Sequence, residues 1–390
     1  MSRQLINHNP DLKRLQDEGY HVEEVSGYLV LRDVPYVNAR GEIKRGILVS
    51  DLQLAGDRTV KPTHVARFAG DHPCNRDGSE IKEIKHASAA EKINDTLTTL
   101  HSFSSKPAEG YTDYHHKMTT YVAIISNPAR AIDPDVTAQT YPVIEPEEGD
   151  DSPFNYIDTA SSRADIVAVT KKLKLSKVAI VGLGGTGSYV LDFVAKTPVR
   201  EIHLFDGDTF LQHNAFRAPG APSVVELRRA LKKVGYLKSR YSKMHRGIVT
   251  HPYSLGVSNA GELEGMDFVF LCLDGGEHKK HVFEKLEELG IPFVDTGMGI
   301  QIVDEKLLGL VCLTTSTPQK REHVRDRVSF ADGGDNEYSR NIQIADLNAL
   351  NATLAVIKWK KHFGFYKDGE NEHHSTYDLD GNIIHNDERP

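Results

Sequence analysis

Residues 177–217 read KVAIVGLGGTGSYVLDFVAKTPVREIHLFDGDTFLQHNAFR, and this stretch decides the fold. Its opening, Lys177–Val181, is a short apolar, β-branched run, which predicts a buried parallel strand. A glycine-rich turn follows, and the apolar spacing after the turn predicts a helix. A second apolar run, Glu201–Phe205, stops at Asp206. A strand, glycine turn, helix, strand and acidic residue in this order are typical of a nucleotide-binding βαβ unit.

The glycine-rich turn is predicted to face a phosphate through Gly182, Gly184, Gly185 and Gly187. Glycine lets the backbone turn sharply and approach a ligand closely. The helix that follows presents free N–H groups and the positive end of its dipole. Asp206, at the tip of the next strand, can accept hydrogen bonds from ribose hydroxyls. Similar turns also occur for packing alone, but here the strand and the helix flank the turn as nucleotide binding requires.

The polar residues after Asp206 indicate which nucleotide is bound. Asp208, Asn214, Arg217 and Lys238 follow in order, and a later apolar strand, Met266–Leu273, ends at Asp274. Over residues 156–365 this order resembles the ThiF/MoeB/ubiquitin-activating enzyme superfamily. Its pattern is GxGGxG, then DxDxVxxxNxxR, then a lysine, then a strand ending in Asp. Phe210 stands where that pattern has Val, and Gly275 where the family often has Asn.

The resemblance implies a role for each polar position. Asp206 would bind the ribose, and Asp208 the ribose or a metal-bound water. Asn214, Arg217 and Lys238 would face the phosphates of ATP, and Asp274 would hold Mg²⁺. Arg163, in the helix before the first strand, would reach the ATP of a neighbouring subunit, although a solvated helix arginine is the plainer interpretation. For Asp208 and Asn214 the plainer interpretation is capping of a loop.

The implied activity is that of a bacterial ThiF-type adenylyltransferase with an extra N-terminal domain. ATP would adenylate the C-terminal carboxylate of a ubiquitin-like protein, usually ending in Gly-Gly, in a thin channel beside the glycine turn. The carrier would then pass to a conjugating enzyme, and the activating enzyme would be a homodimer. Sulfur-carrier activation in cofactor biosynthesis, an NAD(P)-dependent oxidoreductase and a non-catalytic nucleotide-binding scaffold are the alternatives.

The acceptor of the activated carrier is where the sequence departs from the family. The loop Gln319–Arg340, where relatives often carry a cysteine, has none. Three routes stay open: direct transfer to a partner's cysteine, use of Cys74 or Cys312, or an oxyester. The oxyester requires a hydroxyl and a base, for which His323 is the one histidine of the loop. The candidate hydroxyls are Thr314, Thr315, Ser316, Thr317, Ser329 and Ser339.

Composition excludes several classes of protein. The chain has 390 residues, of which 39% are hydrophobic, enough for two or three domains with their own cores. Its 47 basic and 55 acidic residues give a net charge of −8, so nucleic acid and anionic lipid are not general partners. Three cysteines without a CxxC pattern exclude a disulfide scaffold and the usual structural zinc site. No run has the length of a membrane span, and no signal peptide is evident, so we expect a soluble, cytoplasmic protein.

Four regions are predicted along the chain. Residues 1–143 form a smaller α+β accessory domain that recruits a partner, and residues 144–155 an acidic linker. Residues 156–365 form the adenylation domain, an α/β Rossmann-like, mostly parallel sheet with helices on both faces. Residues 366–390 form a polar tail with a possible hairpin about Asp380-Gly381.

Within the first domain we expect a helix at Asn9–Gly19, a hairpin from Tyr20–Val37 and Ile43–Leu54, a helix at Ile84–His101 and a strand at Met118–Ser126. A metal could be held by His72, Cys74, His101, His115 and His116, but their spacing matches no defensible ligand pattern. Cys74 lies in a turn-like segment; it is either an exposed reactive thiol or, more simply, inert.

Four more helices are expected in the second domain. They cover Tyr156–Leu173, with Ser161 or Ser162 as N-cap, and then Val224–Val234, His278–Leu289 and Asn341–Trp359. The last has an apolar stripe that would either pack under the sheet or pair subunits: Ile344, Leu347, Leu350, Leu354 and Ile357.

Overall fold

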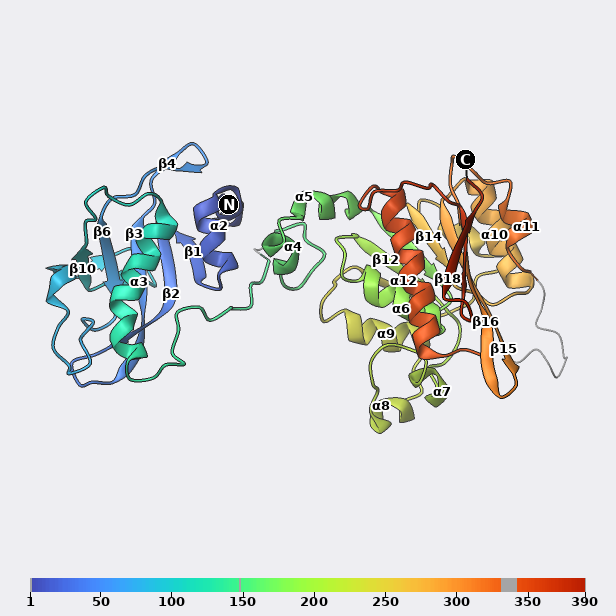
Figure 1. The fold of residues 1–390 in the computed structure, drawn as a ribbon, viewed down its shortest axis with the longest axis horizontal. Coiled ribbons are helices and arrows are strands. Elements are labelled where there is room, and N and C mark those ends of the chain that lie inside the picture. Colours follow the sequence, from blue (N-terminus) through green and yellow to red (C-terminus); the bar gives the residue numbers. More distant parts are fainter. Residues whose placement is uncertain (1, 147–148, 331–341, 390) are drawn as a thin grey trace. The chain divides into compact units, whose positions relative to one another are not determined.

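The computed structural model describes residues 2–146, 149–330 and 342–389. The chain divides into two compact units, one ending at Ile144 and the other beginning at Glu145 (Figure 1). The candidate hydroxyl Ser339 and part of the loop Gln319–Arg340 lie outside the described residues.

Within its described residues, the N-terminal unit contains three α-helices, α1 (Ser2–His8), α2 (Pro10–Asp17) and α3 (Tyr114–Arg130). The predicted helix after Asn9 is confirmed as α2, which begins with a proline in its first turn, where no N–H is needed. The predicted strand at Met118–Ser126 is wrong. That segment lies inside α3, where Met118, Tyr121 and Ile125 are buried at helical spacing. Its β-branched residues resemble a strand locally, but burial of one helical face decides the structure.

The sheet of this unit has six strands in the order β1-β2-β3-β6-β10-β7, all paired antiparallel. The predicted hairpin is confirmed by β2 and β3, which pair from Val37↔Ile43 to Tyr28↔Asp51. The predicted helix at Ile84–His101 is wrong. Most side chains from 85 to 96 are exposed, so a helix there would have no apolar face to bury. The strands are β1 (His21–Val25), β2 (Tyr28–Val37), β3 (Ile43–Asp51), β4 (Leu54–Ala55), β5 (Arg58–Thr59), β6 (Val65–Ala69), β7 (Lys85–Ala87), β8 (Glu91–Lys92), β9 (Thr98–Thr99) and β10 (His101–Ser104), with a 3₁₀ turn η1 (Lys82–Ile84).

The C-terminal unit is built on an eight-stranded sheet in the order β13-β12-β11-β14-β15-β16-β17-β18. The first five strands in this order pair in parallel, and the last three extend the sheet antiparallel. The predicted tail hairpin is confirmed as β17 and β18, which add an edge to the sheet. The strands are β11 (Lys177–Val181), β12 (Glu201–Phe205), β13 (Ile248–His251), β14 (Phe268–Leu271), β15 (Phe293–Val303), β16 (Lys306–Ser316), β17 (His374–Asp378) and β18 (Ile383–Asp387).

Helices cover both faces of this sheet. Val178 and Ile180 of β11 face a core shared with α6, α9 and α12, whereas Ala179 and Val181 face a second core shared with α10. This alternation buries β11 on both sides, as expected for a central parallel strand. The predicted fold class is therefore confirmed. The helices are α6 (Gly185–Val194), α9 (Lys233–Tyr241), α10 (Glu277–Leu289) and α12 (Ala345–His362).

Two expected helices are shorter than predicted. The segment Tyr156–Leu173 breaks into α4 (Thr159–Arg163), α5 (Val167–Thr170) and η2 (Lys171–Leu173). Asp158, not a serine, caps α4 by accepting the Ser161 N–H at 3.0 Å. The segment Val224–Val234 gives α8 (Val224–Arg228), which ends before α9 begins. The remaining short elements are α7 (Gln212–Ala215), η3 (Ala260–Leu263) and α11 (Val324–Arg327).

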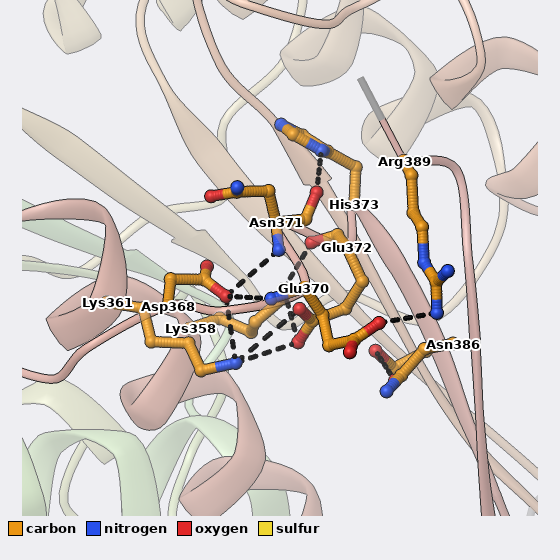
Figure 2. A network of polar contacts seen from close by, with 10 residues as sticks. Lys358, Lys361, Asp368, Glu370, Asn371, Glu372, His373, Asn386 and Arg389 are labelled. Atoms are coloured by element: carbon orange, nitrogen blue, oxygen red, sulfur yellow. Dashed lines mark hydrogen bonds and ion pairs between the residues drawn. The ribbon is translucent and has the colours of Figure 1, made fainter.

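The tail is fixed to α12 by a buried ionic network (Figure 2). Lys358 lies 2.7 Å from Glu372, and both side chains are buried. Lys361 adds contacts to Glu372 at 3.1 Å and to Asp368 at 3.3 Å. Burial alone would raise the pKa of Glu372, but the two lysines outweigh it and hold that pKa below its ordinary value. The tail therefore belongs structurally to the second unit.

Candidate functional site

A cleft lies beyond the carboxyl ends of β11, β12 and β14, where an open α/β sheet places its ligands. It consists of two cavities, of about 230 and 350 Å³. They share Gly182, Asp206, Asp208, Leu273, Asp274, Gly275 and Lys279, so they form one continuous site. Cavities of this size suit a small molecule such as a nucleotide.

The glycine turn closes one side of the cleft, and its glycines do two different things. Gly182 has φ +88°, and a Cβ there would lie 2.5 Å from the Cys272 carbonyl oxygen. At Gly187 a Cβ would lie 1.9 Å from the Gly182 carbonyl oxygen, so this glycine permits α6 to pack against β11. Gly184 also lines the larger cavity, and Gln343 Oε1, at 4.0 Å, is the nearest atom to its Cβ position among the described residues outside its own chain neighbours. The N-terminus of α6 is thus open to an anion.

Asp206 is held in place at the tip of β12. Its Oδ2 accepts the Leu183 N–H at 2.7 Å, and its Oδ1 accepts the Asp208 N–H at 2.8 Å. The residue is only 8% exposed yet lines both cavities. The carboxylate therefore faces the cleft in a fixed orientation, as a ribose acceptor would.

Lys233 lines the larger cavity beside the two aspartates, and sequence reasoning missed it. Its Nζ lies 2.7 Å from Asp208 and 3.4 Å from Asp206, and its side chain is 8% exposed. The bond to Lys233 holds the pKa of Asp208 below its ordinary value. Lys238, the predicted phosphate ligand, is exposed on α9 and does not line either cavity. Lys238 lies five positions after Lys233, which turns it roughly 140° away around the helix.

Arg217 lines the larger cavity, whereas Asn214 does not. Asn214 is 3% exposed, and its Oδ1 accepts the Leu211 N–H at 2.8 Å, so it caps α7. Its carbonyl oxygen accepts the Arg217 N–H at 3.1 Å, which fixes the turn that presents the arginine. The Arg217 Nε is buried without a hydrogen-bond partner among the described residues.

Asp274 is exposed at the mouth of the cleft, two residues past Cys272, and lines both cavities. The described residues contain no group of three His, Cys, Asp or Glu side chains placed for a metal. A lone carboxylate nevertheless fits Mg²⁺, which usually binds one or two carboxylates together with substrate phosphates.

Lys279, on the first turn of α10, also lines the cleft and was not predicted. Its Nζ lies 2.8 Å from Asp295 Oδ1, and both side chains are buried. Burial raises the pKa of Asp295, and Lys279 opposes this effect. The Lys279 charge is therefore already matched by a carboxylate beneath the cleft.

All three cysteines lie in described residues, and none is an activated thiol. Burial raises the pKa of Cys272 to about 12 and also raises the pKa of Cys312 and Cys74. Cys74 is 1% exposed, so the expectation of an exposed thiol in a turn is wrong. Cys74 forms antiparallel backbone bridges with Val37 and with Glu80, and these two neighbouring segments cover the thiol.

Among the candidate hydroxyls, only Ser329 lines the cleft within the part of the chain that the structure describes. Residues 314–317 are all buried. Thr314 and Thr317 bond to His374 and His373, each at 3.0 Å. His323 is buried against His373, and neither of its ring nitrogens has a hydrogen-bond partner among the described residues. Arg163 is exposed on α4 and is not among the residues lining the cleft.

Two asparagines of α12, Asn348 and Asn351, also line the larger cavity. Both are 1% exposed. The predicted apolar stripe of this helix did not reveal them, because Leu350, Leu354 and Ile357 are only half-buried. The signal was present in the sequence as two asparagines at i and i+3, a spacing that places them on one face.

Comparison with known proteins assigns both units. The model of the ThiF family matches residues 160–328, and residues 10–159 match a domain of unknown function, DUF6791. The "Adenylyltransferase and sulfurtransferase UBA4" of Saccharomyces cerevisiae is 29% identical over 144 residues, 35% of this chain and 31% of that protein. The "Ubiquitin-like modifier-activating enzyme 5" of Oryza sativa subsp. japonica is 24% identical over 237 residues, 57% of this chain and 53% of that protein. The chain thus spans about a third and about half of these relatives.

A crystal structure of E. coli MccB superposes with a TM-score of 0.46 and 20% identity, over 59% of this chain and 67% of that one. Among the described residues, no helix has both the length and the apolar character that crossing a bilayer requires. The glycine turn, the ordered polar residues after it and the family match agree on one assignment: residues 160–328 of this chain are a ThiF family domain.

Proposed function

We propose that the protein adenylates the C-terminal carboxylate of a ubiquitin-like protein with ATP. In the reaction, a carboxylate oxygen attacks the α-phosphorus of ATP. The bond from that phosphorus to the oxygen bridging the β-phosphorus breaks, and pyrophosphate leaves. The product is an acyl-adenylate, a mixed anhydride. The protein contributes position and charge rather than covalent chemistry.

The observation that carries this proposal is the state of the cations in the cleft. Lys233 is paired with Asp206 and Asp208, and Lys279 with Asp295. Arg217 has no such partner among the described residues, and its Nε is buried beside the open N-terminus of α6. The side chain of Arg217 is partly exposed, but a buried Nε–H without an acceptor is costly unless an anion binds the guanidinium. A phosphate at the glycine turn is that anion.

Metal binding fits the charge balance of the same cleft. Its lining carries three carboxylates, from Asp206, Asp208 and Asp274, against three basic side chains, from Arg217, Lys233 and Lys279. A triphosphate would bring several further negative charges that these groups do not neutralise. Mg²⁺ at Asp274 would supply the missing positive charge and draw electron density from the transferring phosphate.

The activated carrier is proposed to pass directly to the cysteine of a conjugating enzyme. None of the chain's three thiols has a lowered pKa, which a cysteine nucleophile requires. In the transfer, the partner's thiolate attacks the acyl carbon and AMP leaves. We propose that the N-terminal unit recruits this partner, and that the enzyme works as a homodimer in which Arg163 reaches the neighbouring subunit's ATP.

The test is ATP–pyrophosphate exchange by the purified full chain with a panel of ubiquitin-like proteins ending in Gly-Gly. We expect exchange that depends on the carrier and is lost in Asp274→Ala. Glu264→Ala is the matched control, since Glu264 is an exposed carboxylate that does not line the cleft. Turnover of NAD(P) without any exchange would overturn the proposal in favour of an oxidoreductase.

A further inference from the structure

The larger cavity contains two buried amide groups whose hydrogen bonds are incomplete. Asn351 Nδ2 donates to the Gly297 carbonyl oxygen at 3.1 Å, and Asn348 Oδ1 accepts the Thr186 hydroxyl at 2.9 Å. Asn351 Oδ1 and Asn348 Nδ2 have no hydrogen-bond partner among the described residues. Both residues are 1% exposed and line the cavity. Buried polar atoms left unpaired destabilise a fold, so this pair requires an explanation.

The orientation of the Asn351 amide is fixed by its partner. A backbone carbonyl can only accept a hydrogen bond, so the NH₂ group must face Gly297 and the oxygen must be the unpaired atom. Asn348 lies one turn earlier on the same face of α12, and its NH₂ group supplies a donor. Together the two cavity-lining side chains offer one unpaired acceptor, Asn351 Oδ1, and one unpaired donor, Asn348 Nδ2, which lies 2.1 Å from the position that a Cβ on Gly185 of the glycine turn would occupy.

The strand beside these asparagines has an open edge. β15 pairs with β14 only from Phe293 to Asp295, while its pairing with β16 continues to Val303. From Thr296 onward, the edge that faced β14 has no strand neighbour among the described residues. Thr296, Gly297 and Met298 line the same cavity as the two asparagines. An extended peptide is the ligand that an open strand edge accepts.

An extended main chain also matches the two amide groups. A residue in an extended strand presents its N–H and its C=O toward the same side, as in the hydrogen-bonded pairs of an antiparallel ladder. We propose that Asn351 Oδ1 accepts an N–H, and Asn348 Nδ2 donates to a C=O, of the substrate's last residues before the activated carboxylate. The inference rests on the proposed function and specifies its substrate class: a flexible C-terminal peptide recognised through its main chain.

The test uses an adenylate mimic, 5′-O-sulfamoyladenosine acylated with acetyl-glycylglycine, and two analogues in which one or the other glycine nitrogen is methylated. Binding to the full chain is measured by calorimetry, together with binding of ATP with Mg²⁺. We expect one of the two methylated probes to bind the unmodified protein roughly tenfold more weakly, since a buried acceptor is left unpaired. This comparison requires no variant of the protein.

Variants then locate the acceptor. The Asn351→Leu variant should bind the parent probe roughly tenfold more weakly than the unmodified protein does, and it should bind ATP normally. It should also bind the parent probe and the discriminated methylated probe, the one that the unmodified protein binds more weakly, with equal affinity. Asn348→Leu should weaken the parent probe while still distinguishing the methylated one. Thr353→Ala is the control on α12, because the Thr353 hydroxyl bonds only to the Ala349 carbonyl oxygen of its own helix.

Three results overturn the inference. If the unmodified protein binds all three probes alike, no main-chain N–H is recognised. If Asn351→Leu still distinguishes the methylated probe, the acceptor is another group. In both cases normal ATP binding would leave the proposed adenylation intact. If neither ATP nor the parent probe binds the unmodified protein, the proposed function fails together with the inference.

Discussion

The two candidate lysines of α9 give the sharpest test of the structure against the sequence pattern. The family pattern selects Lys238, whereas the structure places Lys233 beside Asp206 and Asp208. We therefore compare Lys233→Met with Lys238→Met. Removing Lys233 leaves Asp206, whose side chain is 7% exposed, without its cation. Breaking a buried ion pair costs roughly 3–5 kcal/mol. The lower value applies here, because Asp206 keeps two backbone N–H bonds.

A loss of roughly 3 kcal/mol should lower the melting temperature by about 6–12 °C in a unit of this size. Trp359 reports this transition, since it is the one tryptophan of the sequence and is buried in the C-terminal unit. Below that transition, the rate of ATP–pyrophosphate exchange should fall roughly 10²–10³-fold, as for removal of one charge-stabilising group. Because Lys238 is exposed, Lys238→Met should alter neither the melting temperature nor the rate of exchange. If ATP–pyrophosphate exchange were lost in Lys238→Met and kept in Lys233→Met, the prediction that Lys233 is the lysine that serves the cleft would be refuted.

Two further predictions concern the turn and the tail. Gly182→Ala should destabilise the chain by roughly 1–3 kcal/mol and abolish ATP binding, because φ is +88° and the new Cβ meets a carbonyl oxygen at 2.5 Å. Gly235→Ala, within α9 and with no atom within 4 Å, should be neutral or stabilising, and equal losses in both variants would contradict the geometry. Burial lowers the pKa of His323 and His373, so the unfolded state takes up more protons below about pH 6.5 and stability falls there. Urea unfolding followed by Trp359 fluorescence at pH 7 and pH 5 should show this loss. If a variant with both His323→Gln and His373→Gln lost as much stability between pH 7 and pH 5 as the unmodified protein, the two histidines would be excluded as the source of that loss.

The βαβ unit could be predicted from sequence because local and tertiary demands agree in it. Strand β11 needs apolar residues on both faces, the turn needs glycine at Gly182 for φ, and α6 needs a glycine at Gly187 to approach the strand. Each of these requirements selects a recognisable residue type, and the types follow one another in a fixed order along the chain. The position of Asp206 follows from the same order, since a strand that ends at the edge of the sheet presents its next residue there.

The N-terminal unit was predicted less well because local pattern and tertiary packing disagree in it. The segment Met118–Ser126 contains Tyr121, Val122 and Ile125, which favour a strand locally. Packing of α3 on the sheet buries these residues at helical spacing instead. The segment Ile84–His101 shows the reverse: its charged residues permit a helix, but it has no face to bury.

Lys233, Asn348 and Asn351 were missed for one physical reason. A sequence pattern does not fix which side of a helix faces the cleft. A motif fixes which residue types occur, but a shift of a few residues along α9 exchanges Lys238 for Lys233 at the cleft. On α12, the apolar stripe that includes Leu350 and Leu354 is half-exposed, and the buried face carries Asn348 and Asn351 instead.

A buried asparagine with an unpaired atom is selected against by stability alone, so its place on that face points to a ligand. The same reasoning applies to Arg217, whose buried Nε has no hydrogen-bond partner among the described residues. Both features line one cavity, in which Asn351 contacts the Gly297 carbonyl oxygen and Asn348 lies against Gly185 and Thr186 of the glycine turn. A cavity that combines an arginine without an ion-pair partner among the described residues with two unpaired amide atoms is complementary to a molecule that carries both an anionic group and a peptide. An acyl-adenylate of a C-terminal peptide is such a molecule, and a dinucleotide is not.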